Sequence, residues 1–397
     1  MPSALTHYVS ARKQNGIDVS TTVRLLGRYA FLERCAIRAL AAWFLRIPAY
    51  EDKIAMAYQL WGHAERVDVI RRRLNEMRGG HREANIEPSL KRLGEALLNV
   101  PDEAAFLAGM RLIATRLKHA YQEHLDLADR SANAQECRLL RRLIGDLERD
   151  SEWLATPRTP HSSPWTAKLE ILLSQTGGIH GLEPIAYASE KVELVHQQRA
   201  ATLVFDDRIK RGVLQPYAQR MELDFEAKRI AEFRIFFNEF YAAALIATIL
   251  SDAWDLNAPW EFTFDMSHHF WDEVRHAEFG LRRLTELGAQ PDEVNLTLFE
   301  RAESLPVLHR LCYLTLDLEV YFMPRKQPRV KRYEEAGDHR TQLFADVDWS
   351  DEGNHVQYGR RWVDHFLTDD SRTVKDLLAE VGAHMAPALA ANNGVPF

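Results

Sequence analysis

The sequence predicts an all-α fold, and three observations support this prediction. Apolar residues recur at three- and four-residue spacing along most of the 397 residues, whereas strict alternation over strand lengths is rare. With 46% apolar and 27% charged residues, the composition is that of an ordinary globular protein. Long amphipathic stretches are joined by modest loops, which is typical of helical bundles. We therefore expect two four-helix bundles in tandem.

The expected helices lie on either side of a proline-rich segment. Residues 156–164 read TPRTPHSSP, and we place a linker there. It separates a first helical domain (1–155), a linker and irregular connecting region (156–216) and a second helical domain with a C-terminal tail (217–397). The expected helices are 20–46, 50–78, 101–129 and 132–155 in the first domain, and 217–253, 260–287, 292–324 and 348–367 in the second.

Charge and hydropathy exclude several classes of protein. The net charge is −7, the pI is near 6.2, and basic and acidic residues are interleaved, so no broad positive field is present to hold nucleic acid. The longest apolar run, 240–250, is too short for a transmembrane helix, and the N-terminus does not resemble a signal peptide. The three cysteines lack CxxC spacing. We expect a soluble, cytoplasmic protein without a nucleic acid or membrane partner.

A motif of the form Asp-Glu-x-x-His occurs twice, at 272–276 and 351–355. Residues three apart on a helix point to the same side, so the glutamate and the histidine of each motif can offer an oxygen and a nitrogen to one metal ion. Each motif therefore predicts a chelating pair. The pairs are Glu273 with His276, and Glu352 with His355.

A further glutamate precedes each motif at nearly the same distance. Glu239 lies 34 residues before Glu273, and Glu319 lies 33 residues before Glu352. Residues about 34 apart return to the same height when a helix runs for about 17 residues, turns and descends for about 17. Two such hairpins would place four carboxylates and two imidazoles at one level of a bundle. Two divalent cations would neutralise the four glutamates, which would be too costly to bury ionised without them.

The donor set also indicates which metal it would hold. Oxygen-rich ligands with one imidazole per ion suit iron or manganese better than zinc or calcium. We expect the neighbouring Asp272 and Asp351 to accept the far N–H of a ligating histidine and so fix its orientation. His269, four residues before Glu273, could approach the site, but we expect it near a helix end.

The order Glu, Asp-Glu-x-x-His, Glu, Asp-Glu-x-x-His over residues 239–355 resembles the di-iron carboxylate families of the ferritin-like superfamily. These include the small subunit of class I ribonucleotide reductase, the hydroxylase of bacterial multicomponent monooxygenases, and rubrerythrin. The resemblance covers roughly a third of the chain. It implies a ferritin-like bundle holding two iron ions, or a manganese–iron pair, with the four glutamates as catalytic ligands.

The same resemblance implies a di-iron oxygenase or oxidase that uses dioxygen to hydroxylate, desaturate or N-oxygenate a small organic substrate. An electron donor or carrier protein would be its partner, and a homodimer is compatible with the sequence. A ferroxidase or peroxide-scavenging protein is the first alternative. A non-catalytic interaction protein with the same fold is the second. Gly280 stands where the reductase subunit carries its radical tyrosine, which argues against that activity.

The first domain departs from this pattern. Its segment LWGHAE shares His-Ala-Glu with EVRHAE of the second, and in this register Leu60 takes the place of Glu273 while His63 remains. In the last helix, Leu147 and Asp150 take the Glu and His places. We interpret the first domain as a metal-free relative in which Glu33 and His63 are not functional, with a chance match as the alternative.

Two features of the second domain have open interpretations. Gly280 and Gly359, four residues after each ligand histidine, indicate either close helix packing or space beside the metals. Residues 324–347 are expected to form a basic loop that, with the irregular stretch 165–215, closes the substrate pocket. The loop is either solvated or recognises an anionic substrate or partner. Its basic residues are Arg325, Lys326, Arg329, Lys331 and Arg332.

Overall fold

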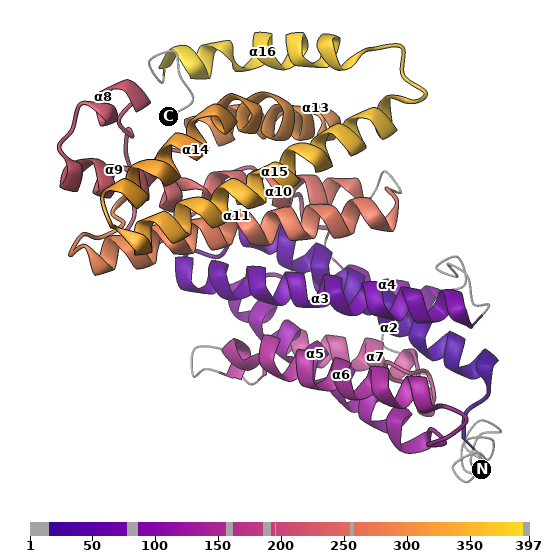
Figure 1. Ribbon diagram of the computed structural model, residues 1–397. Coiled ribbons are helices and arrows are strands. Elements are labelled where there is room, and N and C mark those ends of the chain that lie inside the picture. Colours follow the sequence, from indigo (N-terminus) through magenta and orange to yellow (C-terminus); the bar gives the residue numbers. More distant parts are fainter. Residues whose placement is uncertain are drawn as a thin grey trace. The chain divides into compact units, whose positions relative to one another are not determined.

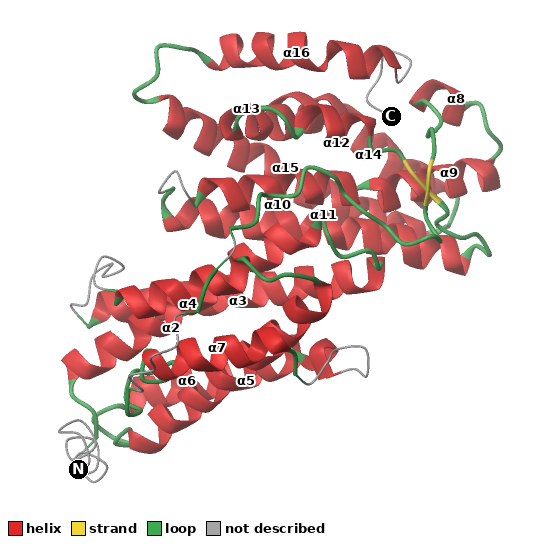
Figure 2. Cartoon of the chain, turned by 180° about the vertical axis from the view of Figure 1, so that it is seen from behind, coloured by secondary structure: helices red, strands yellow, loops and turns green. Residues whose placement is uncertain are grey.

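The computed structural model is helical almost throughout, as Figures 1 and 2 show. Among the described residues, the only strands are β1 (Lys210–Arg211) and β2 (Glu293–Val294), which pair in parallel beside α9. The predicted all-α class is therefore confirmed. The structure describes residues 16–77, 86–155, 162–185, 192–194, 196–254 and 258–391.

The chain forms two compact units. Most of the predicted linker, residues 156–161, lies outside the described residues. The first unit comprises Met1–Trp43 and Tyr58–Gln198, and the second comprises Phe44–Ala57 and Arg199–Phe397.

In the described part of the first unit, six α-helices are present. Helix α7 (Pro164–Gln175) lies at the start of the stretch 165–215, which was expected to be irregular. A capping box between Ser163 and Thr166 fixes its first turn. The expected helix 132–155 ends as an α-helix at Asp150 and continues as the 3₁₀ turn Glu152–Ala155. The helices are α2 (Val19–Phe44), α3 (Tyr50–Glu76), α4 (Pro88–Leu98), α5 (Glu103–Leu127), α6 (Ala134–Asp150) and α7 (Pro164–Gln175), of which α2 and α3 also extend into the second unit.

The second unit is built around α11, which packs against α9 and α10 on one side and α15 on another. The helix α15 also packs on α14 and the π-helical segment η3, while α16 covers α12 and α13, as the yellow outer helix in Figure 1 shows. The helices are α8 (Tyr217–Met221), α9 (Phe225–Asn238), α10 (Phe240–Ala253), α11 (Trp260–Glu286), α12 (Thr297–Ala302), α13 (Val307–Cys312), η3 (Tyr313–Leu318), α14 (Glu319–Glu335), α15 (His339–Leu367) and α16 (Val374–Ala391).

The predicted loop 324–347 is wrong, because helix continues through most of it. Helix α14 runs to Glu335 and α15 begins at His339. Pro324 and Pro328 lie inside α14, where proline removes a backbone donor and disfavours helix. The packing of α14 along α15 offsets this cost, which a local sequence pattern does not reveal.

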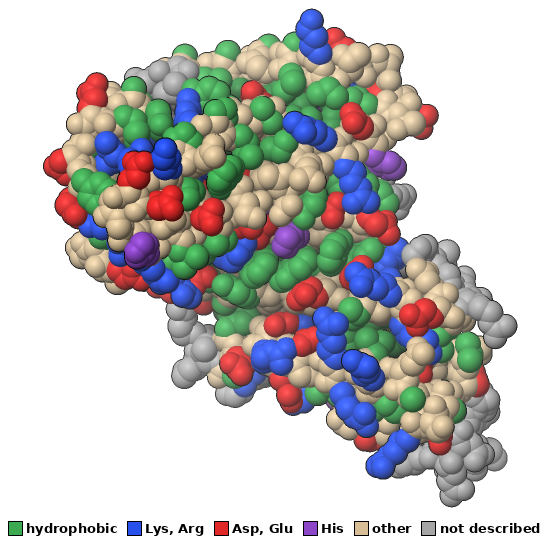
Figure 3. All heavy atoms as spheres, viewed as in Figure 1, with side chains coloured by type: hydrophobic (Ala, Val, Ile, Leu, Met, Phe, Trp, Pro, Cys, Tyr) green, Lys and Arg blue, Asp and Glu red, His purple; other side chains and the backbone are tan. Residues whose placement is uncertain are grey.

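One helical stretch, Phe225–Ala253, is long and apolar enough to cross a membrane by length and composition alone. Within its most apolar window, 83% of the residues are buried inside the protein. This burial is typical of a core helix. On the face shown in Figure 3, basic and acidic side chains are intermixed, in keeping with the sequence pattern.

Candidate metal centre

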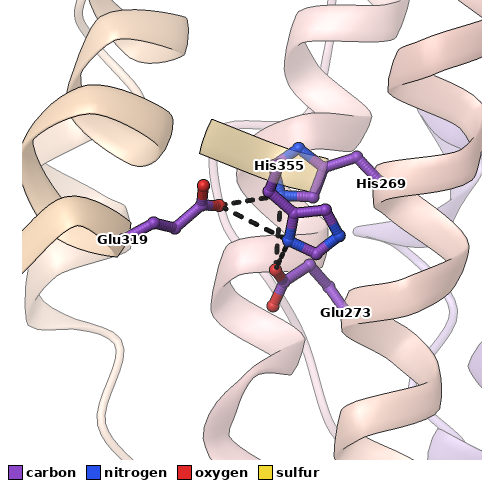
Figure 4. A group of neighbouring side chains, drawn as sticks. All are labelled: His269, Glu273, Glu319 and His355. Carbon is purple, nitrogen blue, oxygen red and sulfur yellow. Dashed lines mark ion pairs between the residues drawn. The ribbon is translucent and has the colours of Figure 1, made fainter. Parts of the chain in front are cut away.

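Four side chains from α11, α14 and α15 point toward one another in the second unit, as Figure 4 shows. One ligand atom from each lies within 4.8 Å of the others, and all four residues are buried. The Nε2 atom of His269 lies 2.9 Å from Oε1 of Glu319 and 3.3 Å from Oε1 of Glu273. The imidazoles of His269 and His355 stack with ring centroids 3.7 Å apart. We call these four residues group A.

A second group of four, group B, consists of Glu239, His276, Asp348 and Glu352. Its ligand atoms also lie within 4.8 Å of one another. The Nδ1 atom of His276 is 3.2 Å from Oε2 of Glu239 and 3.8 Å from Oδ1 of Asp348. Group B therefore offers three carboxylates and one imidazole, whereas group A offers two of each.

The two groups are neighbours. The ring centroids of His276 in group B and His355 in group A are 6.1 Å apart. Every predicted ligand belongs to one of the two groups, so the structure brings all six together. The four glutamates that line a common cavity are Glu239, Glu273, Glu319 and Glu352.

Helix irregularities position the two upstream glutamates. Glu239 lies between α9 and α10, where its N–H bonds the carbonyl of Phe236 three residues back and tightens the turn. Glu319 directly follows the π-helical turn η3. Such turns are rare and are found frequently at functional sites. Both glutamates thus lie at interruptions of regular helix.

Asp272 and Asp351 hold the ligand histidines in a crosswise manner. The Nε2 atom of His355 is 3.1 Å from Oδ2 of Asp272, and Nε2 of His276 is 3.1 Å from Oδ2 of Asp351. Each aspartate therefore contacts the histidine of the other motif. Arg275 donates from Nη2 to both aspartates. The outer ring nitrogens are fixed, which leaves Nδ1 of each histidine directed at the carboxylates.

The chemistry of the donor atoms fits a cation. Buried polar atoms are normally hydrogen-bonded, so several unsatisfied ones at one place require a partner. Both groups contain such atoms even though each group is closely assembled. Some of these atoms lie at ion-pair distance from one another but form no hydrogen bond of suitable direction. The buried atoms without a directed hydrogen bond include Oε2 of Glu239, both ring nitrogens of His269, Nδ1 of His276, both carboxylate oxygens of Glu319, Oε2 of Glu352 and Nδ1 of His355.

The pKa shifts of residues in both groups also indicate that a nearby positive charge would stabilise them. Burial raises the pKa of Glu239 and of Glu319 to about 7, because water no longer stabilises their ionised forms. Burial opposes protonation of His276 and His355, yet their hydrogen-bonded aspartates and the glutamates raise the pKa of both. The ionised forms of Glu239 and Glu319 are therefore poorly stabilised by the protein alone.

Group B already contacts a cation of the protein. Nζ of Lys326 lies 2.9 Å from Oδ1 of Asp348 and 2.9 Å from Oε1 of Glu352, and Lys326 is buried. Arg329 also pairs with Asp348. Group A has no such ammonium partner among the described residues. A metal ion at group B would therefore compete with the Lys326 ammonium for two of its carboxylates, whereas one at group A would not.

The sequence interpretation missed two members of the groups. His269, expected near a helix end, is fully buried nine residues into α11. Asp348 lies outside the Asp-Glu-x-x-His motif at 351–355. Each lies four residues before the glutamate of its motif, His269 before Glu273 and Asp348 before Glu352. The repeated spacing extends each chelating face by one helical turn, and this was the signal that could have identified both.

Close helix packing accounts for both glycines. A Cβ atom at Gly280 would overlap the backbone nitrogen of Phe237, and one at Gly359 would overlap Oγ1 of Thr315. The first contact is with backbone, which cannot move aside. The glycines thus let α9 approach α11 and let η3 approach α15, and they do not mark open space beside groups A and B.

In the first unit, Glu33 and His63 belong to an internal ion network. Glu33 is close to Nδ1 of His63, and Nε of Arg66 lies 3.0 Å from its Oε1. Arg66 also pairs with Asp150, and Tyr121 donates to Glu33. Within the part of the chain that the structure describes, only groups A and B form possible metal clusters.

No protein-family model, no curated protein and no solved structure matches this chain. The roles of its residues are therefore inferred from their own geometry and chemistry.

Proposed function

We propose that the second unit binds two metal ions, preferably iron, and uses dioxygen to oxidise a small organic substrate. The observation that carries this proposal is the convergence of groups A and B on one cavity. Eight donor side chains in two adjacent sets of four, seven of them buried, are an expensive arrangement unless cations occupy them. The cavity gives a substrate access to the four glutamates of the two groups.

The donor set favours iron or manganese over other metals. Five carboxylates and three imidazoles provide mainly oxygen ligands with some nitrogen. Zinc prefers a tetrahedral set with nitrogen or sulfur, and calcium binds oxygen alone. None of the three cysteines belongs to either group. When bound, the ions would supply the redox chemistry that protein side chains lack.

The side chains of the protein would bind the metal ions, orient the ligand histidines and shield the site from water. Groups A and B would hold the ions, while Asp272 and Asp351 fix the histidine rings through their Nε2 atoms. Apolar side chains line the cavity beside the glutamates and exclude water from the reacting groups. Among them are Ile235, Ala242, Leu314 and Leu318.

We also propose that the two units are tandem bundles of a ferritin-like type, the first without metal. The support is a shared pairing: His63 contacts Glu33 through Nδ1, as His276 contacts Glu239. In the first unit, Arg66 provides the balancing positive charge, and a fully buried leucine, Leu60, takes the place of a glutamate ligand.

The proposal is tested by loading the metal-free protein with ferrous iron without oxygen and then admitting oxygen. We expect close to two ions per chain, oxygen uptake and a transient visible absorbance. Glu319→Ala should lower the iron content and abolish oxygen uptake, whereas the exposed control Glu335→Ala should change neither. Well under one ion per chain, or no oxygen uptake by a fully loaded protein, would refute the proposal.

The alternatives predict different results in the same experiment. A ferroxidase would oxidise many ferrous ions per site without an organic co-substrate. A non-catalytic interaction protein would contain little metal. The apolar-walled cavity beside the glutamates is more consistent with an organic substrate than with ferrous iron alone.

A further inference from the structure

The cavity beside groups A and B has a strongly cationic wall. Five basic side chains line it, from α8 and from the part of α14 that was expected to be a loop. The wall continues into apolar side chains and reaches the four glutamates. The basic residues are Arg220, Arg325, Lys326, Arg329 and Arg332.

Three of these five cations have carboxylate partners. Lys326 pairs with Asp348 and Glu352, and Arg329 pairs with Asp348. Arg332 pairs with Glu232. These residues therefore balance charges within the protein.

The other two, Arg220 and Arg325, have no carboxylate within 4.0 Å among the described residues. Arg220 is 5% exposed, and its Nη1 donates to the backbone carbonyl of Gln215 while its buried Nε has no partner. The buried Nη1 of Arg325 also lacks a partner. Buried guanidinium nitrogens without a paired anion are unfavourable, so an anion from outside the protein would stabilise both residues.

Arg220 and Arg325 both line the cavity and both lie beside the ring of Tyr217. Their guanidinium carbons lie 5.8 Å and 4.6 Å from the centroid of the same Tyr217 ring. Burial lowers the pKa of Arg220 to about 10, although the nearby carboxylate of Glu232 raises it. The guanidinium of Arg325 also lies over the rings of Tyr321 and Phe322 on its own helix. Two fixed forks of N–H donors suit an oxyanion.

We propose that this cavity binds an organic oxyanion, a carboxylate or a phosphate group on an apolar body, with Arg220 and Arg325 as the anion-binding pair. The apolar wall takes the body of the ligand, which then extends toward the four glutamates. Much of that wall consists of Ile235, Leu314 and Leu318. The inference names the substrate class of the proposed oxygenase and rests on that function for the reaction, but not for binding.

The experiment measures binding by calorimetry, without oxygen, to the metal-free protein and to the manganese-loaded protein. The probes are octanoate, octyl phosphate and octanol, which share one chain and differ in the head group. We expect at least one anion to bind about tenfold or more tightly than octanol, because charged hydrogen bonds contribute more than neutral ones. The two anions distinguish a carboxylate site from a phosphate site.

Two variants locate the site. Arg220→Gln and Arg325→Gln should each weaken binding of the preferred anion about tenfold or more and leave octanol unchanged. Lys331→Gln, an exposed residue on the same helix α14, should change nothing. Far-UV circular dichroism checks folding. Arg325 is only partly buried, so Arg325→Gln should fold. If Arg220→Gln unfolds, the binding measurement on Arg325→Gln alone tests the proposed site.

Equal binding of all three probes would overturn the inference, as would full anion affinity in Arg325→Gln. Failure of the inference is distinguishable from failure of the proposed function. A protein that binds an anion but takes up no oxygen with iron would refute the function alone. A protein that takes up oxygen with iron but binds neither anion would refute the inference alone.

Discussion

Replacing Lys326 by methionine should strengthen metal binding at group B. The Lys326 ammonium donates to Asp348 and Glu352 at 2.9 Å each, and both carboxylates belong to the group. A hydrogen bond between charged groups contributes about 1.5 to 3 kcal/mol, so releasing both costs roughly 3 to 6 kcal/mol. We expect a metal ion entering group B to displace the ammonium and so to overcome this cost. Because about 1.4 kcal/mol corresponds to a tenfold change in the dissociation constant, Lys326→Met should tighten binding of the second ion roughly 10²- to 10⁴-fold.

The assay is an anaerobic calorimetric titration with manganese. The wild-type protein should show a tighter step for group A and a weaker step for group B, and the variant should bring the two steps together. Lys331→Met, 71% exposed on the same helix, is the control and should titrate like the wild type. The metal-free Lys326→Met protein should also be less stable by roughly 3 to 5 kcal/mol, because buried carboxylates lose their partner.

The opposite outcome would refute this reasoning. If Lys326→Met binds the second ion no more tightly than the wild type, the ammonium does not compete with metal. If the variant loses the second ion while remaining folded, Lys326 supports the site rather than opposing it. Melting curves with and without manganese separate loss of the site from loss of the fold.

Three further predictions concern packing, orientation and pH. Gly280→Ala should destabilise the protein by about 1 to 3 kcal/mol in urea titrations, because its Cβ would meet the backbone of Phe237, whereas Gly353→Ala, with nothing within 4 Å, should be neutral or stabilising. Asp351→Asn should weaken metal binding about 10- to 100-fold by calorimetry, since it contacts Nε2 of His276; unchanged affinity would count against the orienting role. Burial raises the pKa of Glu33, but Arg66 and His63 outweigh it and lower this pKa from 4.5 to about 2. The ionised carboxylate should therefore contribute about 3 kcal/mol to the free energy of unfolding above pH 4.5, and this contribution should be lost as the pH falls toward 2. Glu33→Gln should remove that part of the pH dependence of urea unfolding. If the free energy of unfolding varies with pH in the same way in both proteins, the prediction is contradicted.

Long amphipathic helices were predictable because their periodicity extends over many turns. The expected 20–46, 50–78 and 260–287 agree with α2, α3 and α11 to within two residues at each end. The interruption at Glu239 and the helix through 324–335 were not predictable. Both depend on packing between segments distant in sequence, which outweighs local preference.

The candidate site was predictable to the extent that its residues share a helical face. Spacing of three residues identified each Glu and His pair, and matched distances identified Glu239 and Glu319. Lys326 shows where this reasoning ends. Its position in the sequence indicates only a basic segment, and its contact with group B depends on how α14 packs on α15.

The two units illustrate two ways to balance a buried Glu–His pair. Glu33 and His63 are neutralised by Arg66, a guanidinium that cannot leave. Glu239 and His276 have no guanidinium partner among the described residues, and the nearest ammonium, that of Lys326, bonds other carboxylates of group B. A cation that the protein does not carry covalently could bind and depart at this pair, which is why we propose a metal site in the second unit and a fixed ion network in the first.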